Sequence, residues 1–142
     1  MKNVKHLKLE VNLNEERQML SDLVAPYLQE RFNISFSSIK GRMKFIQKLN
    51  HHDCFNSMYE KKIDSTDDTV DEILNMLERK KAPKNCYVIS TNYHIDGKRM
   101  LLKEALVAIH GNQQGSIICC IPGKLLYYEG EYKKRYIIEK NI

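Results

Sequence analysis

The sequence predicts an α+β fold in a single domain spanning residues 1–142. Apolar residues recur at three- and four-residue spacing through much of residues 1–81, which is typical of helices packed on a core. Residues 85–142 instead contain short apolar runs separated by Gly and Pro, which is typical of antiparallel strands joined by turns. We therefore expect an N-terminal strand and helices over residues 1–81, then a mainly antiparallel sheet with one buried helix over residues 85–142.

The chain is expected to begin with a half-buried strand over residues 4–13. Leu7, Leu9, Val11 and Leu13 alternate with polar residues, and this period of two places one side of a strand on a core.

A helix is predicted to follow this strand. Asn14 is expected to cap it, with Glu15 and Glu16 in the first turn, where the free N–H groups of a helix favour carboxylates. Pro26 lies inside the same apolar periodicity. Because proline lacks an N–H group and clashes with the preceding turn, it predicts a kink or a restart.

A second helix is predicted over residues 39–49, capped by Ser37 or Ser38. On a helical wheel a solvent-facing ridge is formed by Lys40, Lys44 and Lys48. Arg42 lies in the apolar arc of the same helix. Its stem either packs while its head reaches water or a carboxylate, or its guanidinium is positioned for an anionic ligand.

The densest group of reactive side chains is His51, His52, Asp53 and Cys54. These residue types serve as metal ligands or as acid–base groups, but consecutive residues cannot surround one ion without ligands from elsewhere. Two interpretations follow. The segment is a polar loop or helix cap, or it is a site in which Cys54 acts as a nucleophile beside an imidazole.

An acidic segment occupies residues 64–78 and contains no basic residue. Thr69 and Glu72 have the spacing of a capping box, and they predict the start of a third helix that ends near Lys80. This acidic helix and the lysine ridge of residues 40–48 either face each other across the fold or are separately solvated.

The second half begins with a β-like run over residues 86–91. Asp96 and Gly97 form a turn signal. Residues 101–109 are then apolar on most sides, which predicts a helix packed against the sheet, and Gly111 can close it with a left-handed cap.

Residues 116–121 form an unbroken apolar run, so we expect the central strand of the sheet here, with both faces covered. Residues 125–129 and 132–139 are expected to pair as an antiparallel hairpin near the sheet edge. Three basic residues near its turn would discourage pairing with another chain: Lys133, Lys134 and Arg135.

The motifs of common catalytic and cofactor sites do not occur. Gly111, Gly115 and Gly123 are too far apart to form a phosphate-binding loop. The cysteines lack the C-x-x-C spacing of zinc or redox sites. Glu129 and Glu131 are a candidate carboxylate pair, and a turn is expected between them at Gly130. We therefore expect no cofactor, no bound metal and no catalytic residue.

The composition indicates a cytoplasmic protein. The first residues lack the apolar core of a secretory signal, and no apolar run approaches the length of a membrane-spanning helix. The four cysteines fit free thiols in a reducing compartment. A net charge of +5 gives a weak preference for anionic partners.

The leading hypothesis is a small, non-enzymatic binding or regulatory module that contacts a protein partner through the C-terminal hairpin and nearby loops. The candidate binding residues are Arg42, Lys124, Tyr128 and Arg135. They belong to residue types enriched in interfaces or in anion binding. The alternatives are a nucleic-acid-binding protein that uses the hairpin and the lysine ridge, and a small enzyme with a site near His51 and Cys54.

Overall fold

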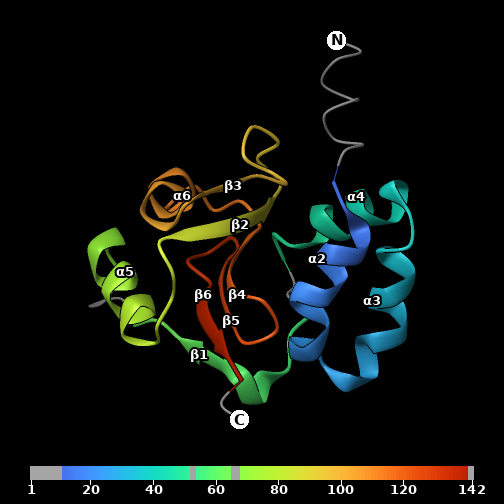
Figure 1. Cartoon of the computed structure of the whole chain (residues 1–142), viewed down its shortest axis with the longest axis horizontal. Coiled ribbons are helices and arrows are strands. Elements are labelled where there is room, and N and C mark those ends of the chain that lie inside the picture. Colours follow the sequence, from blue (N-terminus) through green and yellow to red (C-terminus); the bar gives the residue numbers. More distant parts are fainter. Residues whose placement is uncertain (1–10, 52–53, 65–67, 141–142) are drawn as a thin grey trace.

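A computed structural model describes residues 11–51, 54–64 and 68–140 of the chain. Figure 1 shows a central sheet with helices packed against both of its faces. The helices come first along the chain, and strands dominate the C-terminal half. This arrangement confirms the predicted α+β fold.

The sheet has six strands in the order β1-β6-β5-β4-β2-β3, and every neighbouring pair is antiparallel. The strands are β1 (Glu60–Lys62), β2 (Asn85–Ser90), β3 (Arg99–Leu101), β4 (Ser116–Ile121), β5 (Leu125–Glu129) and β6 (Arg135–Glu139). The predicted central strand is confirmed as β4, which lies between β5 and β2. β1 was not predicted, and it takes the edge position beside β6.

Three α-helices cover one face of the sheet. They are α2 (Leu13–Leu20), α3 (Gln29–Ser35) and α4 (Ile39–Lys48), with the short 3₁₀ segments η1 (Ser21–Leu23) and η2 (Pro26–Leu28) between the first two. Pro26 is at the first position of η2, which confirms the predicted restart. Ser38 caps α4, since its hydroxyl accepts the N–H of Gly41 at 3.0 Å.

Two α-helices cover the other face: α5 (Val70–Arg79) and α6 (Leu102–Ile109). Thr69 caps α5, because its hydroxyl accepts the N–H of Glu72 at 3.2 Å. Gly111, with φ of +80°, follows the end of α6 in the left-handed conformation that was expected. A third 3₁₀ segment, η3 (Ser57–Tyr59), leads into β1.

The core has two parts, one on each face of the sheet. Ile117 and Cys119 of β4 pack towards the α2, α3 and α4 layer, whereas Ile118 and Cys120 pack towards α5 and α6. Successive side chains of a strand point to opposite faces. Both faces of β4 are therefore buried, which explains its unbroken apolar sequence.

The helix start differs from the prediction by two residues. Asn12, rather than Asn14, caps α2, because its side chain accepts the N–H of Glu15 at 3.0 Å. Leu13 consequently begins α2 instead of ending a strand. Residues 4–10 of the predicted N-terminal strand lie outside the described part of the chain.

Two opposing charged regions do not meet within the molecule. The acidic α5 lies on one face of the sheet and the lysine ridge of α4 lies in the layer on the other face (Figure 1). Among the described residues, no helix combines the length and the apolar character that crossing a membrane requires.

Candidate functional site

The four candidate binding residues do not form one surface. Arg42, Tyr128 and Arg135 are buried, with 2%, 0% and 5% of their surfaces exposed. Only Lys124, in the turn between β4 and β5, is exposed. Alanine at Tyr128 or Arg135 would therefore disturb the core instead of removing a surface contact.

Arg42 is the centre of a buried ionic cluster. Its Nε and one terminal nitrogen donate to the carboxylate of Glu16 at 2.6 and 2.8 Å, and its terminal nitrogens donate to Asp96 at 2.8 and 2.9 Å. Tyr87 donates its hydroxyl to Glu16 at 2.5 Å. Burial lowers the pKa of Arg42, but its hydrogen bonds and attraction to Glu16 and Asp96 outweigh this effect and raise the pKa above its ordinary value.

The Arg42 cluster thus joins α4 to α2 and to the loop that contains Asp96. This geometry corresponds to the interpretation in which the arginine packs and reaches carboxylates. Arg42 positions the helix that carries the lysine ridge, and its guanidinium is already bound on both sides.

Arg135 is the centre of a second cluster of similar composition. Its Nε donates to Glu129 at 3.2 Å, and a terminal nitrogen donates to Asp68 at 2.9 Å. Glu129 also accepts the hydroxyl of Tyr127 and the N–H of Gly111, both at 2.8 Å. Burial, followed by the charge of Glu129 and the hydrogen bond to it, raises the pKa of Tyr127. The carboxylate of Glu129 therefore forms hydrogen bonds within the fold.

Tyr128 is a structural residue of the helical layer's core. Its hydroxyl donates to the backbone oxygen of Leu49, at the end of α4. Its ring stacks with Tyr136 at a centroid distance of 6.2 Å. The hairpin therefore buries the ring of Tyr128 in the core instead of presenting it to a partner.

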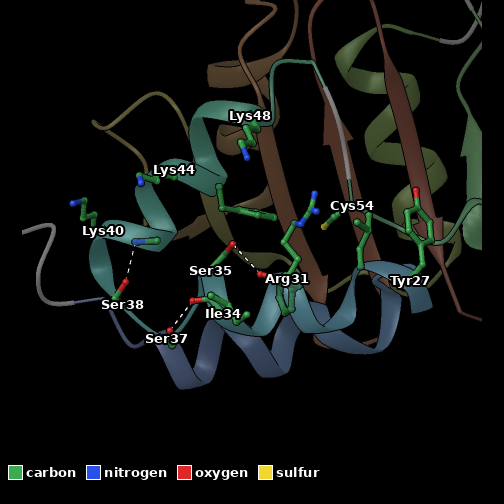
Figure 2. Close-up of a pocket in the computed structure, with 14 residues that line it drawn as sticks. Tyr27, Arg31, Ile34, Ser35, Ser37, Ser38, Lys40, Lys44, Lys48 and Cys54 are labelled. Atoms are coloured by element: carbon green, nitrogen blue, oxygen red, sulfur yellow. Dashed lines mark hydrogen bonds between the residues drawn. The ribbon is translucent and has the colours of Figure 1, made fainter.

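A groove with a volume of about 940 Å³ lies between α3 and α4. We call it the α3–α4 groove. The residues that line it are Tyr27, Leu28, Arg31, Phe32, Ile34, Ser35, Ser37, Ser38, Lys40, Gly41, Lys44, Phe45, Lys48 and Cys54. Figure 2 shows the three lysines following one another along α4, with Arg31 on the α3 side.

Aromatic packing fixes the two walls of the α3–α4 groove. Phe36 lies in the short connection between the helices, 4.8 Å from Phe32 and 4.9 Å from Phe45 between ring centroids. Phe32 and Phe45 meet edge to face at 5.9 Å. Such pairs add to the burial of apolar area. The floor is therefore part of the core and is formed before any ligand binds.

The α3–α4 groove is strongly basic for its size. Arg31, Lys40, Lys44 and Lys48 line it, and among the described residues no Asp or Glu does. Its serine hydroxyls are used locally: that of Ser35 donates to the Arg31 oxygen at 3.0 Å, and that of Ser37 donates to the Ile34 oxygen at 2.6 Å. Four cations around an apolar floor can attract a ligand that is both anionic and partly apolar.

A second hollow lies beside β1 and α5, with a volume of about 470 Å³. Lys61, Lys62, Arg79 and Lys80 line it together with Asp64. Lys80 is already paired with Glu139 at 2.6 Å. This hollow is smaller and partly neutralised, so the α3–α4 groove is the better candidate for a binding site.

The reactive segment near His51 is only partly described, because His52 and Asp53 lie outside the described residues. His51 contacts the carboxylate of Glu131, whereas Cys54 is half-buried at one end of the α3–α4 groove (Figure 2). The described parts of the chain contain no group of three or more His, Cys, Asp or Glu placed to hold a metal ion.

Sequence reasoning identified one wall of the groove and missed the other. The lysine ridge of α4 follows from a helical wheel. Arg31 and Ile34 were not singled out, although Ile34 is 65% exposed. Ile34 follows Arg31 by three residues, a spacing that places both side chains on the same side of a short helix. Three residues connect this helix to α4, which carries the lysine ridge.

Comparison of the chain with family models, with curated proteins and with solved structures finds no match.

Proposed function

We propose that this protein is a small, non-enzymatic binding module that holds an acidic segment of a partner protein in the α3–α4 groove. The observation that supports this function is a groove whose described lining residues include four cations and no carboxylate, above an apolar floor. A cationic rim attracts carboxylates during encounter, and an apolar floor then supplies contact area that water cannot. The contact surface is thus the helical layer instead of the C-terminal hairpin.

A protein partner is favoured over a nucleic acid by the shape of the floor. Single-stranded nucleic acids bind on exposed aromatic faces, on which successive bases stack. Here Phe32 is 2% exposed and Phe45 is half-buried, so Tyr27, at 85%, is the exposed ring of the lining. Leu28 and Ile34 add aliphatic surface, which suits the side chains of a protein.

The proposed setting is the cytoplasm. All four cysteines are free, and Cys86, Cys119 and Cys120 are buried as thiols. A reducing compartment keeps cysteines in this form.

The test is affinity purification of the tagged protein from its native cells, comparing the wild type with Lys44→Glu. Lys44 is exposed and lines the groove, so reversing its charge is expected to remove the partner without unfolding the protein. The matched control is Lys103→Glu, the same charge change at an exposed position of α6 on the other side of the sheet. It should leave the partner bound.

A second matched pair tests the apolar floor. Ile34 in the groove and Val107 on α6 are 65% and 61% exposed. Ile34→Asp should abolish capture of the partner, and Val107→Asp should not. The purification is repeated with nuclease. If the captured material disappears, the protein binds nucleic acid and the proposal is overturned. A partner that all four variants still capture would overturn it as well.

A further inference from the structure

We infer that the occupant of the α3–α4 groove is an amphipathic α-helix whose carboxylates recur every four residues beside an apolar stripe. This inference rests on the proposed function and adds the conformation and the charge spacing of the partner segment.

The spacing of the cations sets the spacing of the carboxylates. Lys40, Lys44 and Lys48 lie four residues apart on one helix. With a rise of 1.5 Å per residue, successive positions are about 6 Å apart along the axis, and the whole row covers about 12 Å. A second helix laid along α4 repeats its side chains at the same interval when acidic residues occupy positions i, i+4 and i+8. Each carboxylate then lies opposite one lysine.

Arg31 extends this pattern to the other wall. It is exposed and lies on α3, facing the lysine row across the floor (Figure 2). A helix in the groove therefore has cations on both sides of its apolar stripe. The expected segment is acidic on both flanks of that stripe, with more carboxylates on the side of α4.

Backbone hydrogen bonding favours a helix over an extended segment. In the part of the chain that the structure describes, the groove is lined by η2, α3, α4, their connection and Cys54, and by no residue of the sheet. An extended peptide that binds by strand addition pairs its N–H and C=O groups with a free strand edge, and the edge strands among those described are β1 and β3. A helix forms the hydrogen bonds of its backbone groups internally. It can therefore lie on an apolar floor without burying unpaired N–H and C=O groups.

The shape of the floor also fits a helix. Tyr27 and Ile34 stand exposed along the α3 side, seven residues apart, which is close to two helical turns. Phe45 is half-buried on the α4 side. An apolar stripe from a third helix would pack between these side chains, as the ridges of one helix pack into the groove between others.

The test uses three fluorescently labelled peptides of about 18 residues, long enough to form a helix. The first has glutamates every fourth position beside a leucine stripe. The second has the same composition with the glutamates moved to the face opposite the leucines. The third is the first peptide with two central residues replaced by proline, which keeps the charge and prevents the helix. Binding is measured by fluorescence anisotropy with the wild type, Lys44→Glu and Lys103→Glu.

The first peptide is expected to bind the wild type and the Lys103→Glu variant equally, and Lys44→Glu at least tenfold more weakly. The second and third peptides should each bind the wild type at least tenfold more weakly than the first. If the proline peptide binds as tightly as the first peptide, the inference of a helical occupant is overturned, whereas the proposed function is not. If none of the three peptides binds, the inference of a helical occupant is also overturned. In that case the proposed function is tested separately, by whether Lys44→Glu abolishes capture of a partner from cells.

A second copy of this chain is the competing occupant, because α5 carries exposed carboxylates such as Asp71 and Glu78. Sedimentation of the protein without peptide separates the two cases. If the protein sediments as a monomer, the result supports a helix from a different protein as the occupant. Self-association that Lys44→Glu abolishes would overturn the inference in favour of contacts between copies.

Discussion

At the scale of single residues, the molecule is stabilised by two buried arginines, one on each side of the sheet. Each contacts one glutamate and one aspartate, and a tyrosine hydroxyl donates to the glutamate in each case. A buried guanidinium remains stable in the core only while the carboxylates that it contacts are present. The Arg42 cluster joins α2, α4 and the loop that contains Asp96, and the Arg135 cluster joins β5 and β6 to Asp68 and Gly111.

Replacement of Arg42 with methionine is expected to lower the free energy of unfolding by about 3 kcal/mol or more, because Glu16 and Asp96 would remain as buried, uncompensated carboxylates. Urea unfolding followed by circular dichroism measures the effect. Arg79→Met is the control, since Arg79 is exposed on α5, on the other face of the sheet, and its replacement should cost less than about 1 kcal/mol. Similar losses in both variants would show that the Arg42 cluster has no special role.

The position of Arg42 in the apolar arc of its helix predicted burial, but its partners did not follow from the sequence. Glu16 was expected to sit at a helix start because of the dipole, and Asp96 was expected to form a turn. The contacts between these residues span 26 and 54 positions of the chain. Local patterns carry no information on contacts of that range, which arise only when α2, α4 and the loop after β2 pack together.

At the scale of elements, the β5–β6 hairpin has an unusual turn. Tyr132 and Lys133 have φ values of +56° and +59°, and the N–H of Lys134 donates to the oxygen of Glu131 at 3.2 Å. Two consecutive positive φ angles are typical of a hairpin turn that favours Asn-Gly. The sequence Tyr-Lys gives no such signal, so the predicted strand began at residue 132 and the observed strand begins at Arg135.

Lys133→Gly is expected to raise the free energy of unfolding by about 1 kcal/mol, because glycine adopts positive φ without the steric cost that a side chain carries. Thermal or urea unfolding measures the gain. Lys133→Ala serves as the control: it removes the same charge but retains a Cβ atom, so it should give no comparable gain. Equal stabilisation by alanine and glycine would mean that charge, and not backbone conformation, limits the turn.

The remaining elements show where local sequence decides structure. β4 and β5 have the predicted bounds, because Pro122-Gly123 and Gly130 separate strongly apolar runs. β1 was missed, because Glu60–Lys62 is short and polar and forms a strand only through its pairing with β6. Only the α4 side of the groove was predicted, because periodicity identifies the lysine ridge but does not show which helix packs beside it.

At the scale of the whole molecule, burial of thiols and phenols makes the fold sensitive to alkaline pH. Burial raises the pKa of Cys86 from 9.0 to about 11, and burial together with the nearby Cys86 raises that of Cys119 to about 12. The unfolded chain releases these protons from about pH 9, whereas the folded chain keeps them. The folded state therefore binds more protons above pH 9, and stability falls as pH rises through this window.

Urea unfolding under reducing conditions is expected to show a free energy of unfolding at least about 2 kcal/mol lower at pH 10 than at pH 8, since each such thiol contributes up to about 1.4 kcal/mol per pH unit. Cys119→Val removes one of these groups at little cost in volume, so its drop should be smaller. A pH dependence that is the same in the variant and the wild type would contradict this origin.

The pairing of β1 with β6 has a consequence for synthesis on the ribosome. Glu60 pairs with Ile138, so β1 emerges long before the strand that completes its hydrogen bonds. The walls of the α3–α4 groove, by contrast, are neighbours in the chain and can assemble from local contacts as soon as they are made. A nascent chain at that stage presents a helical pair with both its basic groove and its unburied core face open. Such a chain is a ready client for chaperones until the final strand arrives.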